Sequence, residues 1–123
     1  TPLPLPLAQA ALTSLRILKS TRTLRPRLLR NAARVKTALR QAGLALPDAP
    51  GPIIPLLPRH PDEAARLSRS LFAAAIFPPF LKYPGGPPGG CFRFVISSEH
   101  NDAQLDNLIQ VLRRHLTLPP ASA

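Results

Sequence analysis

Apolar residues recur at intervals of three or four along four stretches of the chain, which is the spacing of one face of a helix. The first predicted helix covers Ala8–Lys19 and follows an extended start over Thr1–Pro6, where alternate prolines disfavour helical backbone. The second covers Leu24–Ala42 and tolerates Pro26 because this proline lies in the first turn. The predicted apolar stripe of this second helix consists of Leu28, Ala32, Val35 and Leu39.

The third and fourth helices have clear start signals in the sequence. Pro61-Asp62-Glu63 places a proline and two acids in a first turn, where the helix dipole favours negative charge. Asn101 with Gln104 resembles a capping box, with Asn as the capping residue. The fourth helix is expected to end at Pro119-Pro120. Its predicted apolar face comprises Leu105, Leu108, Ile109, Leu112 and Leu116.

Three segments between the helices are typical of strands or extended chain. Cys91–Ser97 is the clearest strand because aromatic and β-branched residues dominate it. Pro52–Pro58 contains internal proline and is therefore predicted to be an edge or irregular strand. Ala75–Leu81 is expected to be extended, and the Gly/Pro-rich Tyr83–Gly90 is expected to be a turn-rich loop. This order predicts an α+β fold: a small antiparallel-type sheet of about three strands, covered by helices and preceded by a long connecting helix.

Charge is the most unusual feature of the composition, with 16 basic and 6 acidic residues and a net charge of +10. Thirteen of the basic residues are Arg, spread over four segments without a run of like charge, so specific nucleic-acid binding is disfavoured. Because no apolar run is long enough to span a bilayer, we expect no membrane association. The single Cys91, expected to be half-buried in its strand, excludes an internal disulfide and fits a reduced, cytoplasmic setting.

Most catalytic templates do not fit this sequence. His60, His100 and His115 are far apart, and none has metal-ligand spacing with Cys91 or a carboxylate, so no metal is predicted. The glycines of the 83–90 loop precede a strand rather than a helix, unlike those of a phosphate-binding loop. We therefore predict no catalytic residue within the chain, and expect any reaction to depend on groups outside it.

Arg93 is the main candidate binding residue. It lies between Phe92 and Phe94 in the clearest strand, so its side chain projects from the opposite face of the pleat. A buried or cleft-lining guanidinium requires an anionic partner. Two partners remain open from the residues alone: one of the chain's own acids, or a ligand carboxylate held in bidentate fashion.

Several motifs, in their order along the chain, resemble the C-terminal part of a known enzyme family. They are Pro78-Pro79 with the Gly/Pro loop up to Arg93, then Ser97-Ser98-Glu99-His100, then 104–108, QLDNL. The start of the chain and the segment 51–56, GPIIPL, also agree. Together they resemble the α-oxoamine synthases, fold-type-I pyridoxal-phosphate (PLP) enzymes related to class II aminotransferases, among them 8-amino-7-oxononanoate synthase.

This resemblance implies a division of the chain and a set of roles. Residues 1–22 would be the end of the large cofactor domain and the connecting helix, 23–118 the C-terminal small domain, and 119–123 a tail. Arg93 would bind the carboxylate of the amino-acid substrate, and Thr1 would contact the PLP phosphate. Pro78, Pro79 and His100 would line the site, with His100 more structural than chemical.

The resemblance also implies an activity that this chain cannot perform alone. The full-length homodimer would condense an amino acid with an acyl thioester and release CO₂. Since the Schiff-base lysine of the family lies upstream of the matching segment, and the chain starts at Thr1 without any Met, we expect the natural protein to continue upstream. Alternatives are an aminotransferase of the same fold, a non-catalytic basic interaction fragment, and the remnant of a broken gene.

Two departures from the family pattern concern the acyl substrate. Many members carry a second arginine at the position of Cys91, and the loop from Lys82 to Gly86 is longer than usual. Both changes lie at the entry to the site, so the sequence does not specify the acyl donor.

Overall fold

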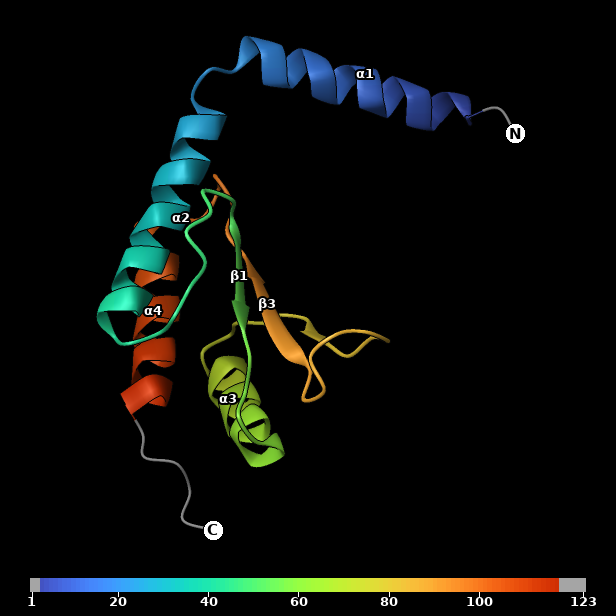
Figure 1. Cartoon of the computed structure of the whole chain (residues 1–123). Coiled ribbons are helices and arrows are strands. Elements are labelled where there is room, and N and C mark those ends of the chain that lie inside the picture. The colour runs from blue at the N-terminus through green and yellow to red at the C-terminus, as the bar shows by residue number, and fades with distance from the viewer. Residues whose placement is uncertain (1–2, 118–123) are drawn as a thin grey trace.

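The chain forms four helices and a three-stranded sheet in a computed structural model that describes residues 3–117 (Figure 1). Thr1, the second residue and the predicted tail 119–123 therefore lie outside the described residues. The elements in chain order are α1 (Leu5–Ser20), α2 (Leu24–Gln41), β1 (Ile53–Leu56), α3 (Pro61–Ala73), β2 (Phe80–Leu81), β3 (Cys91–Val95) and α4 (Asp102–Thr117).

The sheet has the order β1-β3-β2, and both pairings are antiparallel. Ile54 lies opposite Phe94 in one pair, and Phe80 lies opposite Phe92 in the other. The proline-containing β1 is an edge strand, as predicted, because proline cannot donate a hydrogen bond to a second neighbour. The structure confirms the predicted α+β class with a small antiparallel sheet and covering helices.

One face of the sheet carries the hydrophobic core. The two-residue period of the strands turns Ile54, Phe92 and Phe94 toward the helices, and all three are buried. Helices α2 and α4 lie side by side against this face, with α3 packed beside α4 (Figure 1). Their contributions to the core include Ala32, Val35, Leu39, Leu67, Leu71, Leu105, Leu108, Ile109 and Leu112.

The opposite face of the sheet is open. Ile53 and Val95 lie opposite each other on it and are about half exposed, and the exposed Arg93 lies two residues before Val95, opposite Pro55. Helix α1 extends away from the rest of the molecule and buries none of its residues (Figure 1). Every helix within residues 3–117 is too short or too polar to cross a lipid bilayer.

Four sequence predictions need correction. The predicted extended start is wrong at Leu5 and Pro6, because α1 already begins at Leu5 and takes Pro6 into its first turn, where no backbone donor is needed. Ala75 is not extended but has a left-handed backbone with φ 56°. The clearest strand ends at Val95 rather than at the predicted seventh residue. Cys91 is 8% exposed and thus buried rather than half-buried.

Candidate functional site

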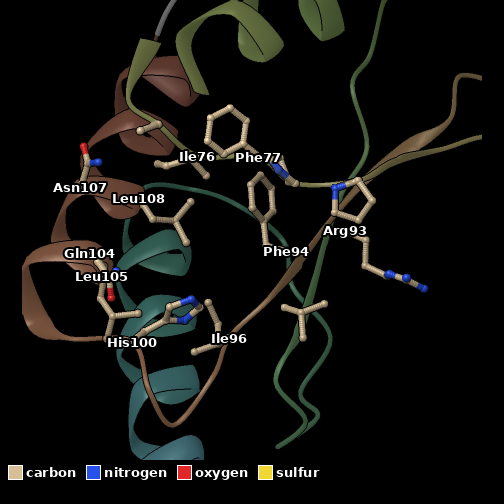
Figure 2. Close-up of a pocket in the computed structure, with 14 residues that line it drawn as sticks. Ile76, Phe77, Arg93, Phe94, Ile96, His100, Gln104, Leu105, Asn107 and Leu108 are labelled. Atoms are coloured by element: carbon tan, nitrogen blue, oxygen red, sulfur yellow. The ribbon is translucent and has the colours of Figure 1, made fainter. Parts of the chain in front are cut away.

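An open cavity of about 380 Å³ lies where β3, the segment after α3 and the first half of α4 meet (Figure 2). Phe77, Phe94 and Leu108 form part of its apolar wall, while Gln104 and Asn107 add neutral polar groups from α4. The complete lining is Ala75, Ile76, Phe77, Pro78, Pro79, Arg93, Phe94, Val95, Ile96, His100, Gln104, Leu105, Asn107 and Leu108. The cavity therefore brings together Arg93, Pro78, Pro79 and His100, which the sequence predicted as site residues.

The turn after α3 positions the proline wall of this cavity. Ala75 takes a left-handed conformation, and Ile76 N–H then donates to Leu71 O at 2.9 Å, which ends the helix. The chain continues extended through the prolines, and Arg93 N–H donates to Pro79 O at 3.0 Å. This bond holds the proline segment against β3 next to the side chain of Arg93.

Arg93 lies at the rim of the cavity and is exposed. Figure 2 shows its side chain leaving β3 on the side away from Phe94 and His100, as the alternation of a strand requires. Among residues 3–117, none of the ion pairs or hydrogen bonds involves the Arg93 guanidinium. Of the two partners left open by the sequence, an acid of this chain is therefore excluded within the described part.

His100 is held in one orientation at the base of the cavity. Ser97 N–H donates to His100 Nδ1 at 3.0 Å, so the neutral imidazole carries its proton on Nε2. The buried Asn31 side chain donates from Nδ2 to Ser97 O at 3.0 Å and to His100 O at 3.1 Å. Helix α2 thereby fixes the turn that carries His100, which supports the structural role expected for this residue.

The described residues do not by themselves fit PLP. No lysine lines the cavity, and Lys36 is buried and donates to the carbonyl oxygens of Ala49 and Gly51. Lys82 lies exposed in the loop after β2, with its Nζ 6.0 Å from the Phe80 ring centre. The cavity offers one cation, Arg93, which suits a carboxylate better than a phosphorylated cofactor that also needs an amine. The predicted phosphate contact, Thr1, lies outside the described residues.

A buried ionisable pair was not predicted from the sequence. Glu63 Oε1 lies 3.2 Å from His115 Nε2, between α3 and α4. Burial favours a higher pKa for Glu63, but hydrogen bonds and charge from Arg59, together with His115, outweigh it and lower that pKa. Burial lowers the pKa of His115, against the opposing effect of Glu63. The signal was present, because both residues continue the apolar stripes of their helices at a spacing of three or four.

No group of three or more His, Cys, Asp or Glu side chains in the described part is arranged to hold a metal ion. The acidic residues serve other purposes, since Asp102 and Asp106 both pair with Arg34. The Arg93 guanidinium at the rim of the cavity is chemically suited to bind an anion through two parallel hydrogen bonds.

Known proteins resemble the chain in both sequence and fold. A family model described as aminotransferase class I and II matches residues 1–112. The 8-amino-7-oxononanoate synthase of Nitrosococcus oceani is 35% identical over 114 residues, which make up 89% of this chain and 30% of that protein. The enzyme of the same name from Thioalkalivibrio sulfidiphilus is 32% identical over 117 residues, 94% of this chain and 30% of that protein. The chain thus spans about a third of the length of these relatives.

Two solved structures share the architecture. The 8-amino-7-oxononanoate synthase of Francisella tularensis superimposes with a TM-score of 0.79 at 24% identity, over 94% of this chain and 34% of that one. A serine palmitoyltransferase from Sphingomonas wittichii gives a TM-score of 0.74 at 25% identity, over 84% of this chain and 27% of that one. The fold agrees with both, and the family model covers most of the sequence. The chain belongs to the aminotransferase class I and II family.

Proposed function

We propose that this chain is the C-terminal part of a PLP-dependent acyltransferase of the α-oxoamine synthase type. The full-length protein would condense an amino acid with an acyl thioester, release CO₂ and leave an α-amino ketone. Support comes from the relatives named 8-amino-7-oxononanoate synthase and from the shared fold. PLP, when bound, would supply the electron sink for this chemistry. Residues upstream of this chain would hold the cofactor.

The observation that carries the proposal is the position of Arg93. Its guanidinium lies at the rim of a cavity, has no acidic partner among residues 3–117, and projects from the uncovered face of the sheet. A planar guanidinium binds a carboxylate through two parallel hydrogen bonds. We assign Arg93 to the carboxylate of the amino-acid substrate, while Pro78, Pro79 and His100 shape the wall beside it.

The division of the chain follows from the same proposal. Residues 1–22 would pack on the cofactor domain, with Thr1 near the PLP phosphate, and residues 23–118 would form the small domain. Two exposed apolar surfaces support this assignment: one face of α1, including Leu12 and Leu15, and the open sheet face with Ile53 and Val95. The full-length enzyme would be a cytoplasmic homodimer, and the isolated chain would be inactive because it lacks the Schiff-base lysine.

The test is an Arg93→Lys substitution in the full-length protein that contains this chain. Lysine keeps the charge but cannot reproduce the bidentate geometry, and a charge-assisted hydrogen bond contributes about 1.5–3 kcal/mol. We expect the KM for the amino acid to rise about tenfold or more. The KM for the acyl thioester should change little. Arg30→Lys, on the exposed side of α2, is the matched control.

The reaction itself is followed by the release of free thiol and CO₂ from mixtures of a small amino acid and an acyl thioester. Transfer of the amino group to a keto acid, without thiol release, would identify the alternative aminotransferase instead. An unchanged KM for the amino acid in Arg93→Lys would show that the carboxylate binds elsewhere.

A further inference from the structure

A second groove, of about 520 Å³, lies between α3 and α4. Helix α3 contributes Arg66 and Arg69 to its lining, and α4 contributes Gln110 and Arg114. Asn107 Nδ2 donates to Ala74 O at 3.0 Å, and these two residues form the boundary toward the first cavity, to which Asn107 also contributes. The groove therefore opens beside the first cavity and does not include Arg93.

The described residues that line the groove are basic or neutral. Glu63 lies next to them, with its Oε1 3.2 Å from His115 Nε2. The acids that form ion pairs in residues 3–117 pair with basic groups other than Arg66 and Arg69: Asp48 with Arg40, Glu63 with Arg59 and His115, Glu99 with Arg27, and Asp102 and Asp106 with Arg34. Arg66 and Arg69 consequently have no acidic partner in the described part of the chain.

The spacing of these arginines concentrates the charge. Arg66 and Arg69 are three residues apart on α3, so they are neighbours on the helix surface, where like charges repel. Arg114 of α4 also lines the groove. His115 also lines the groove; burial lowers its pKa, Glu63 opposes this, and the charge of Arg66 lowers the pKa further. Arg66 and Arg69 therefore give the α3 side of the groove positive charge that no described acid pairs with.

We propose that this groove binds a small ligand that carries two or more linked phosphate groups. The neighbouring guanidinium groups of Arg66 and Arg69 can contact linked phosphates at the same time, and phosphate accepts the bidentate hydrogen bonds that guanidinium donates. The Ser70 hydroxyl and the Gln110 amide line the groove as further donors. Such phosphates occur in free pyrophosphate and in nucleotides, and the two sources differ in the groups attached to them.

The proposal is tested by calorimetric titration of the full 123-residue chain with pyrophosphate at low ionic strength. The wild type should bind one equivalent. Arg66→Gln with Arg69→Gln should weaken binding by about tenfold or more, because each charge-assisted contact exceeds the energy of a tenfold change. The control is Arg25→Gln with Arg30→Gln, two exposed arginines of α2 that remove the same charge elsewhere. Control and wild type should bind alike.

A single-residue variant and a second ligand distinguish the remaining explanations of the titration. Arg69 is exposed and Arg66 half-buried, so Arg69→Gln alone serves if the double variant does not fold, and it too should weaken binding. Equal binding of ADP and pyrophosphate would identify the linked phosphates as the recognised group. Tighter binding of ADP, still lost in the double variant, would add a nucleotide-specific contact.

Two results would overturn the proposal. Equal weakening in the groove variant and in the α2 control would mean that only the net charge of the chain attracts the ligand. Absence of pyrophosphate and ADP binding, together with salt-sensitive binding of a single-stranded RNA oligonucleotide, would identify a diffuse polyanion surface instead.

Discussion

His115 and Glu63 form the buried ionisable contact of the domain, and their two pKa shifts make its stability depend on pH. The folded pKa of His115 lies below its ordinary value of 6.5, so the unfolded chain binds a proton first as the pH falls. The folded pKa of Glu63 also lies below its ordinary value of 4.5, so protonation of this carboxylate at lower pH destabilises the fold as well. Both groups therefore stabilise the fold fully above pH 6.5 and lose this contribution on acidification.

We expect the free energy of unfolding of the chain, measured with urea, to fall between pH 7 and pH 5. A His115→Gln variant should lose most of this slope, because glutamine does not titrate. His60→Gln, at an exposed position that precedes α3, should keep it. If His115→Gln shows the wild-type slope, another group controls the acid response of the domain.

Single residues were predictable where the chemistry is visible in the local pattern. Arg93 interrupts an apolar strand, and its placement on the face opposite Phe92 follows from the two-residue period alone. The burial of Lys36 was not predictable in this way. Its partners are the carbonyl oxygens of Ala49 and Gly51 in a loop that the periodicity of α2 does not describe.

At the scale of elements, the residues that mark the start of a helix were more informative than helix propensity. The same rule that allowed Pro26 and Pro61 inside helices also applies to Pro6, and applying it there would have placed the start of α1 at Leu5. The turn at Ala75 had no such signal, since an alanine rarely adopts a left-handed conformation. The cavity beside Arg93 depends on this turn, so its shape was beyond a reading of the sequence.

The start of α4 offers a direct test of a cap predicted from the sequence. Asn101 Oδ1 accepts from Gln104 N–H at 2.9 Å, and Gln104 Oε1 accepts from Asn101 N–H at 3.0 Å. Asn101→Ala should lower the free energy of unfolding by about 1 kcal/mol, the usual effect of losing an N-cap. Gln104→Ala removes only the reciprocal bond and should cost less. Equal urea midpoints for Asn101→Ala and wild type would show that the cap does not stabilise the fold.

For the whole molecule, the uneven distribution of buried surface is the main physical feature. The core is built by α2, α3, α4 and the sheet, whereas α1 contributes no buried residue. Leu5 and Leu18 remain more than half exposed, although the sequence gives α1 an apolar face. The periodicity predicted the helix, but it could not show that none of its residues would be buried.

This distribution predicts how the chain exchanges its amide hydrogens. A 16-residue helix without tertiary contacts is only marginally stable in water. We therefore expect the amides of α1 to exchange much faster than those of α2, whose buried Val35 and Leu39 tie it to the core. Hydrogen exchange followed by mass spectrometry of the 123-residue chain resolves the two helices as separate peptides. Equal protection of α1 and α2 would contradict the prediction. Protection of α1 that declined on dilution of the chain would indicate self-association through the apolar face of α1. Protection that did not depend on concentration would indicate that α1 packs on the rest of its own chain.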